Sequence, residues 1–447
     1  MRIRPSRHLN TCITLLILMI TCITARSQSE SILVEVTSLE ELIKLARARN
    51  PDLNSYILNV EKSNYDVKTS KAALLPSISG SFSGQKNIDL ATTPVPGEFF
   101  GQPGTTVDAQ FGQQYAYNAG ISVNKALLDW QSSLKIKIAE LSLKTSESQR
   151  DAYLILLDQL VATNYYSILI SKRAISLAEK DLEIADSVLV IIEQKFKEGL
   201  IDASAINQAR INSNLSKQNL NNSKQLYRNT CIDLKVLLGL HEKDTLQIVA
   251  SYSLTVPPVY SVSALAPQER IKLASLSQQQ AQYQVAIQKS MFVPKLSLNG
   301  YYGKQQFRED FGLDLGNKTW SNYSFVGFNL SVPIFNGFAN RNKLKTSKID
   351  LNLSEIELNK INIESNLQDL KLIEEYRTSI TNTELALEAF QLYEENERLA
   401  LQKYSEGVIS LDRYFNAFED YLKSENVYLN ALLTTYSLYS QIIPRVQ

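Results

Sequence analysis

The chain has 447 residues, enough for two or three ordinary domains, and its 46 basic residues balance its 46 acidic residues. This balance excludes a general affinity for polyanions such as nucleic acids. Glycine and proline, the weakest helix formers, number only 16 and 12, and 44% of the residues are hydrophobic. The composition therefore favours a helix-rich protein.

The first 27 residues predict a cleaved export signal. Arginines precede an apolar core over residues 13–25, and Ala25 and Ser27 are the small residues that a signal peptidase reads. We expect cleavage before Gln28. An anchor helix would need a longer core, and a lipid on Cys22 is disfavoured by the preceding Thr21. Cleavage leaves 42 basic residues against 46 acidic ones and a single cysteine, Cys231, so no intrachain disulfide is expected.

Two short helices are predicted next, over residues 38–49 and 50–73. The first opens with the capping box of Ser38 and Glu41, and the second has Pro51 in its first turn. No later segment has 18 uncharged apolar residues, so we expect no transmembrane helix. An exported chain of this kind is either soluble or crosses a membrane as β-strands.

Alternating segments then predict strands near residues 77–84 and 115–124. The second has apolar residues on one face and small or polar residues on the other over about ten positions, which matches a membrane-crossing strand. A half-buried hairpin of a soluble sheet has the same pattern. Residues 85–114, between the two segments, are predicted to be an irregular loop. Aromatic residues at strand ends, Tyr115, Tyr302 and Tyr323, suggest an interfacial girdle.

The longest predicted helix follows, because no proline or glycine interrupts residues 130–198. At 1.5 Å per residue, these roughly 70 residues would extend about 100 Å. Apolar residues recur with a period of 3.5, the pattern of helices packed by knobs into holes. The recurring positions are Leu154, Leu157, Val161, Asn164, Ile168, Ser171, Ile175, Ala178, Leu182, Ala185, Leu189, Ile192 and Phe196. A turn at Gly199 then predicts a return helix over residues 204–239, rich in Asn and Gln, whose polar face should contact water.

The second half of the chain repeats this order. Strands are predicted near residues 296–302 and 322–332, and long helices over 338–443 with a turn at Gly407. The tip sequence at residues 403–410 matches that at 195–202 with an offset of 208. We therefore divide the mature chain into two repeats, residues 28–262 and 263–447, each with two strands and two long helices.

Four strands cannot close a barrel, and open strand edges are not tolerated in lipid. If these strands span a membrane, several chains must combine them, and a trimer would supply twelve. The predicted fold class is therefore mainly α, with a long coiled-coil α-helical barrel, four transmembrane strands per chain and an internal duplication. The Asn- and Gln-rich faces would line a wet lumen.

Several motifs together resemble the TolC family of outer-membrane efflux proteins. They are LLPSIS at residues 74–79, VPIFNG at 332–337, and the tips KFKEGLID and KYSEGVIS. The resemblance covers about residues 39–443. It implies a trimer with a twelve-stranded barrel in the outer membrane of a Gram-negative bacterium and a helical barrel in the periplasm. It also implies partners, namely a periplasmic adaptor and an inner-membrane pump, in either tripartite efflux or type I secretion.

The resemblance also assigns site residues. The expected adaptor contacts at the tips are Gly199, Leu200, Ile201, Gly407, Val408 and Ile409. The expected periplasmic entrance consists of Tyr404, Asp412, Arg413 and Asn416. The family prototype has acidic residues where this chain has Arg413 and Asn416, so a cation-favouring acidic ring is not expected here. Asp412 or Glu419 could pair with Arg413 on the surface.

The sequence argues against an enzyme, a metal site or a cofactor. The mature chain has one histidine, His241, and one cysteine, Cys231, without metal-ligand spacing. No phosphate-binding loop or nucleophile elbow is present. The alternative to a passive export duct is a periplasmic coiled-coil scaffold with a soluble β-cap. Drugs, metals, siderophores and proteins all remain open as cargo.

Overall fold

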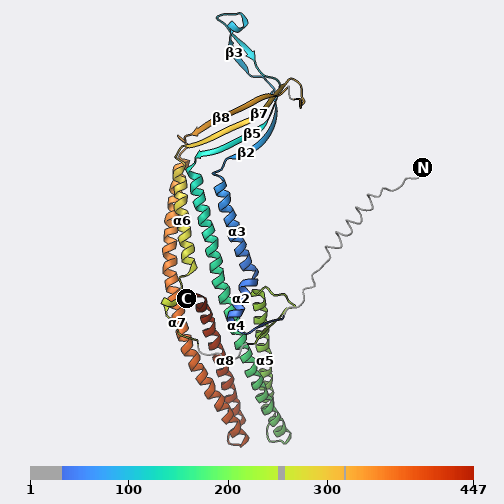
Figure 1. The fold of residues 1–447 in the computed structure, drawn as a ribbon. Helices are drawn as coiled ribbons and strands as arrows, with labels where there is room; N and C mark the ends of the chain where they lie inside the picture. Colours follow the sequence, from blue (N-terminus) through green and yellow to red (C-terminus); the bar gives the residue numbers. More distant parts are fainter. Residues whose placement is uncertain (1–32, 250–256, 317–318, 447) are drawn as a thin grey trace, which may run out of the picture. The chain divides into compact units, whose positions relative to one another are not determined.

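The computed structural model describes residues 33–249, 257–316 and 319–446 (Figure 1). The predicted signal segment lies outside the described residues. The chain forms two compact units, and each takes segments from both sequence repeats. The sheet unit comprises residues 51–156, 259–375 and those from Arg445 onward, and the tip unit comprises residues up to Asn50, 157–258 and 376–444.

An antiparallel sheet of four strands, in the order β2-β5-β7-β8, characterises the sheet unit (Figure 1). Its strands are β2 (Ser77–Lys86), β5 (Tyr115–Leu128), β7 (Lys295–Arg308) and β8 (Ser321–Ser331). They lie where the alternating segments predict them, although β7 continues six residues beyond its predicted end. The strands of the two repeats meet at the β5–β7 pair, where Gly120 faces Gly303.

The expectation of an irregular loop over residues 85–114 was wrong. This segment contains a second hairpin, β3 (Thr92–Pro96) paired with β4 (Thr106–Gln110), and a short 3-10 helix, Gly97–Phe100 (Figure 1). β3 contains two prolines, which have no N–H to donate to a neighbouring strand. The sequence pattern therefore does not predict a strand here.

The two faces of the four-stranded sheet differ in chemistry. One carries exposed apolar side chains: Ile78, Phe82, Ile121, Tyr302, Val326, Phe328 and Leu330. The other carries serine and asparagine rows, and Ser79 and Ser122 share a hydrogen bond of 2.8 Å across strands. Tyr323 lies on this polar face with Tyr301 and Phe325, their ring centroids 5.6–6.1 Å apart. Of the three predicted girdle residues, Tyr323 is therefore on the face opposite to Tyr302.

The helices of the sheet unit begin or end at this sheet. They are α3 (Pro51–Ala72), α6 (Glu269–Ser290), the first part of α4 (Trp130–Lys197) and the first part of α7 (Ala339–Ser405). Asp129 caps α4, as its Oδ1 accepts from the backbone N–H of Gln131 at 3.1 Å and its Oδ2 accepts from Ser132 at 2.7 Å. Because of this cap, helix α4 begins directly after strand β5 ends.

The tip unit is a helical bundle. It contains α2 (Leu39–Arg49), α5 (Ala203–Leu237), α8 (Leu411–Ile442) and the remaining parts of α4 and α7. Strand β1 (Leu33–Val36) pairs in parallel with β6 (Thr245–Ile248). The last helical element of the described residues is a 3-10 helix, Ile443–Arg445.

The period of 3.5 on α4 describes its packing correctly. Twelve of the thirteen seam positions are buried or half-buried, and Phe196, next to the turn, is 40% exposed. Near the turns, α4, α5, α7 and α8 share one hydrophobic cluster, with Ile192, Ile206, Phe390 and Phe418 among its buried residues.

Among the residues that the structure describes, one helix, α4, is long and apolar enough by composition to cross a membrane, with a window of mean hydropathy 1.3. Half of that window is buried inside the protein, which is also the property of a core helix. The finding is weak evidence for a membrane-spanning helix.

Candidate functional site: two helix tips and the groove between α5 and α8

The two helix reversals are built from the same hydrogen bonds. At the first, Gly199 N–H donates to the Phe196 carbonyl (3.0 Å) and Leu200 N–H to that of Lys195 (3.0 Å). At the second, Gly407 N–H donates to the Tyr404 carbonyl (3.0 Å) and Val408 N–H to that of Lys403 (2.8 Å). Each donor and acceptor of the second set lies 208 positions after its counterpart.

Side chains complete the correspondence. Asp202 caps α5 by accepting from Ala205 N–H at 2.9 Å, and Ser410 caps α8 by accepting from Arg413 N–H at 3.4 Å. A side-chain bond in the last turn before each glycine also recurs. Gln194 donates to Glu198 at 3.1 Å, and Gln402 donates to Glu406 at 3.0 Å. Local sequence therefore fixes both tips in one geometry.

The tip glycines occupy the left-handed region, with φ of +72° at Gly199 and +75° at Gly407. A Cβ on either would meet no atom within 4 Å, so the backbone conformation and not crowding requires glycine. The following residues, Leu200 and Val408, are each 67% exposed. Ile201 and Ile409 behave differently, because both pack against the hydrophobic cluster.

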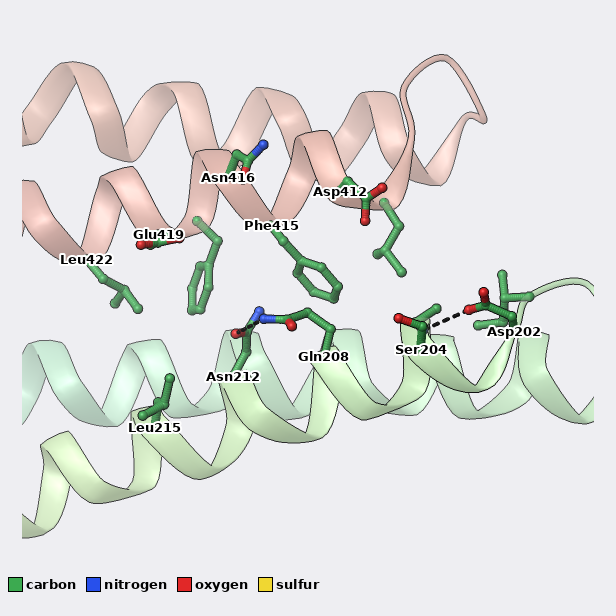
Figure 2. A pocket seen from close by; sticks show the side chains of 14 residues that line it. Asp202, Ser204, Gln208, Asn212, Leu215, Asp412, Phe415, Asn416, Glu419 and Leu422 are labelled. Atoms are coloured by element: carbon green, nitrogen blue, oxygen red, sulfur yellow. Dashed lines mark hydrogen bonds between the residues drawn. The ribbon is translucent and has the colours of Figure 1, made fainter.

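A groove of about 800 Å³ runs between α5 and α8 beside the tips (Figure 2). Figure 2 shows Phe415 pointing from α8 toward α5, with polar side chains around it. Three carboxylates line the groove, Asp202, Asp412 and Glu419, and no lysine or arginine is among its lining residues. Its other lining residues are Ile201, Ser204, Ala205, Gln208, Asn212, Leu215, Leu411, Phe415, Asn416, Phe418 and Leu422.

A second groove, of about 520 Å³, lies between α7 and α8. It contains Val408, Ile409 and Arg413, and it shares Asn416 with the first groove. The predicted entrance residues are thus divided between two grooves, with Asp412 in the first, Arg413 in the second and Asn416 in both. Glu419 forms its ion pair with Lys423 at 2.8 Å.

The remaining predicted entrance residue, Tyr404, is buried. Its ring stacks on that of Tyr414 with centroids 6.0 Å apart, and the Lys195 ammonium lies 4.4 Å from its centroid. A cation over an aromatic face is attracted by the ring quadrupole. Tyr404 therefore connects the last turns of α4 and α7 and is not part of either groove lining.

Below the tips, the bundle contains buried carboxyl groups that the sequence reading did not select. Glu397 accepts from Tyr414 Oη at 3.1 Å, and Asp181 accepts from Tyr421 Oη at 2.8 Å. Burial raises the pKa of both carboxyls, and it raises the pKa of both tyrosines above their usual range. Acidic residues within apolar stripes were the available signal: Asp181 falls between Leu177 and Ala185, and Glu425 between Tyr421 and Tyr428.

Comparison with known proteins agrees with the fold. The model of the outer membrane efflux protein family matches residues 42–240 and 261–437. A probable efflux pump outer membrane protein of Pseudomonas putida, TtgC, is 23% identical over 329 residues, covering 72% of this chain and 64% of TtgC. The pyoverdine export outer membrane protein OpmQ of the same organism is 23% identical over 414 residues, covering 90% of this chain and 80% of OpmQ.

Solved channel structures share the architecture. The CmeC outer membrane channel of Campylobacter jejuni superposes with a TM-score of 0.70 at 18% identity, covering 94% of this chain and 90% of CmeC. VceC of Vibrio cholerae gives 0.70 at 16% identity, with 91% and 95% covered. The open MtrE channel of Neisseria gonorrhoeae gives 0.66 at 18% identity, with 91% and 88% covered. Because the family model matches most of the chain, the protein belongs to the outer membrane efflux protein family.

Proposed function

We propose that the protein is a passive export duct of the outer membrane, a homotrimer opened at its helix tips by a periplasmic adaptor that connects it to an inner-membrane pump. The observation that carries the proposal is the pair of matching tips, each with an open glycine turn and an exposed aliphatic residue beside a groove. Energy for transport is supplied by the pump, so the protein itself acts without catalysis or cofactor.

The four-stranded sheet supports the membrane assignment. Its exposed apolar face suits lipid and its serine- and asparagine-rich face suits water, as in outer-membrane barrels. Within the described residues, the edge strands β2 and β8 each pair with one strand only. Unpaired strand edges are not tolerated in lipid, so copies of the chain are expected to pair through them. Three copies would give twelve strands.

The two tips support the adaptor assignment. We assign the contact to Gly199, Leu200 and Ile201 at one tip and to Gly407, Val408 and Ile409 at the other. Leu200 and Val408 are exposed equally, so they are available as apolar anchors, whereas Ile201 and Ile409 hold the turns against the bundle. The acidic groove between α5 and α8 is suited to a basic partner segment. Asp412, Arg413 and Asn416 then lie where solutes would enter the duct, with Tyr404 supporting the closed arrangement.

The tips can be tested by capture of partners. We expect crosslinked wild-type protein to retain an adaptor and a pump identified by mass, and Gly199→Arg or Gly407→Arg to lose both while still forming trimers in the membrane. Arginine adds bulk, charge and left-handed backbone strain. Gly337→Arg is the matched control, because Gly337 also has positive φ (+65°) and open space but lies outside the tips.

Two outcomes would contradict the assignment. Partner capture that survives both tip substitutions would remove the adaptor contact from the tips. Loss of the trimer itself would make the tips structural elements only. Fractionation tests the scaffold alternative, because a periplasmic filament would appear in the soluble fraction and a duct in the outer membrane.

A further inference from the structure

Two acidic side chains lie at the contact of α4 with α8 in the tip unit. Asp181 is 4% exposed and Glu425 is 6% exposed. Asp181 belongs to the buried stripe of α4 that contains Leu177, Ala185 and Val188. A carboxylate in such surroundings loses its hydration, so it must be neutralised or fully hydrogen-bonded.

The hydrogen bonds of Asp181 and Glu425 compensate for only part of the hydration that the two carboxyl groups lose on burial. Tyr421 Oη donates to Asp181 Oδ1 at 2.8 Å. Glu425 lies four residues after Tyr421, on the same face of α8, so its buried carboxyl group lies on the side of α8 that meets Asp181. Oε2 of Glu425 is buried and has no hydrogen-bond partner among the described residues. Two ionised carboxylates both lack a donor, so a bond between them requires a proton on one.

The charged and titratable groups around the pair do not replace that proton. On α4, Lys180 pairs with Glu394 of α7 at 2.5 Å and also attracts Asp181, but burial outweighs this attraction, and exposed Arg173 exerts only a weaker attraction on Glu425. On α7, Glu397 adds a negative charge near Asp181. On α8, the neighbouring buried tyrosines Tyr421 and Tyr428 have raised pKa values and stay neutral, and Lys423 pairs with Glu419 at 2.8 Å. On α5, Lys224 pairs with Glu179, which lies on the other side of α4 because it is two residues before Asp181.

We propose that Asp181 and Glu425 share one proton that joins α4 to α8 below the tips, and that loss of this proton loosens the junction. Burial first, and then repulsion by Asp181, raises the pKa of Glu425 to about 8, and burial also raises the pKa of Asp181. The proton is thus held at neutral pH. Above pH 8 two buried negative charges face each other, and the helices separate to hydrate them.

The sign of the pH dependence follows from linkage. Glu425 has a folded-state pKa above its unfolded value, so the folded protein binds more protons between pH 4.5 and about 8. The contribution of the pair to stability is complete below that window and declines as pH rises through it. The junction is therefore tight in mildly acidic conditions and weak in alkaline ones, independently of whether the duct is engaged by a partner.

The test uses the purified full-length protein in mild detergent at pH 6 and pH 9. Infrared difference spectra should show loss of a carboxylic acid carbonyl band in the wild type at the higher pH. Hydrogen exchange of α8 amides, corrected for intrinsic rates, should accelerate up to about a hundredfold, because two pH units separate pH 6 from the Glu425 pKa of about 8. Glu425→Gln keeps a donor toward Asp181 at every pH, so both signals should become independent of pH. Glu388→Gln removes an exposed acid on α7 and should retain the wild-type response.

Two further variants keep the outcome decisive. Asp181→Asn should also abolish the pH response, which covers a failure of Glu425→Gln to fold. Tyr421→Phe removes the donor to ionised Asp181, so the midpoint of the infrared transition should move to higher pH. The proposal is overturned if Glu425→Gln and Asp181→Asn keep the wild-type carbonyl band change, or if Tyr421→Phe leaves the midpoint unchanged or lowers it.

Discussion

Glu397 of α7 and Tyr414 of α8 form a buried hydrogen bond that the amphipathic pattern did not indicate. Glu397 is 5% exposed and Tyr414 is 1% exposed, and Tyr414 Oη lies 3.1 Å from Glu397 Oε1. Burial raises the pKa of Glu397, although the hydrogen bond from Tyr414 opposes this increase. At the residue scale, the tyrosine hydroxyl therefore replaces part of the lost hydration of the carboxyl group.

The contribution of the Tyr414 hydroxyl to the stability of the protein can be tested by substitution. We expect Tyr414→Phe to lower the free energy of unfolding by about 1–3 kcal/mol, the cost of a buried polar group without its partner. The loss should be larger at pH 8 than at pH 5, since the variant increases the folded-state pKa of Glu397 further and unfolding then releases the proton. Denaturant unfolding followed by circular dichroism measures this. Tyr393→Phe, on exposed Tyr393 of α7, is the control, and an equal loss in both variants would refute the explanation.

At the scale of elements, the β5–β7 pair shows where glycine is required for close approach. A Cβ on Gly303 would lie 2.5 Å from the Ala119 carbonyl oxygen and 2.8 Å from the Gly120 Cα. A Cβ on Gly120 would lie 2.6 Å from the Tyr301 ring. The Tyr301 ring thus covers two glycines on the polar face of the sheet, in the space that their missing side chains leave.

Because β5 and β7 approach closely at Gly303, an added methyl group should destabilise the sheet at this position but not at an open one. Gly303→Ala should destabilise the sheet by about 1–3 kcal/mol, because the strands must shift to admit the methyl group. Gly327→Ala on β8 adds the same group where no atom lies within 4 Å and should be nearly neutral. The folded fraction that survives a temperature series, read from heat-dependent gel mobility, distinguishes the two. Equal sensitivity of both variants would show that the β5–β7 contact tolerates a side chain.

At the scale of the whole molecule, residues remote in sequence are tied together near the described end of the chain. Arg445 makes two bonds of 2.7 Å to the carboxylate of Asp369, and its Nη2 donates to the Ala266 carbonyl at 2.8 Å. Gln268 Nε2 donates to Asp369 as well, at 2.7 Å. Burial acts to raise the pKa of Asp369, but hydrogen bonds from Arg445 and Gln268 lower it overall. Arg445 therefore connects α7, through Asp369, to the segment that precedes α6, through the Ala266 carbonyl.

Acidification should weaken the Arg445–Asp369 ion pair. A depressed folded-state pKa means that its stability is present above the unfolded value, near 3.8, and is lost as pH falls below it. Asp369→Asn should cost about 3–5 kcal/mol at pH 7, since it leaves Arg445 buried without its counter-charge. The same variant should show a smaller further loss between pH 5 and pH 3 than the wild type. Thermal unfolding over that range measures both, and parallel acid profiles would contradict the assignment.

Sequence alone determined the features that depend on near neighbours. The period of 3.5 on α4, the caps at Ser38 and Asp129, and the turns at Gly199 and Gly407 are set by hydrogen bonds or packing within a few positions. The alternation of the four strands is of the same kind. The doubled tips and the efflux family could therefore be predicted before any coordinates, as could the positions of the long helices.

Only the tertiary structure decided which distant residues meet. The Tyr421–Asp181 bond joins residues 240 positions apart, and β6 becomes a strand only because β1 lies beside it. Register, not composition, placed Tyr323 on the face opposite to Tyr302. Likewise, Asp181 and Glu425 are buried on two different helices, because burial depends on what packs against a helix and not on the helix alone.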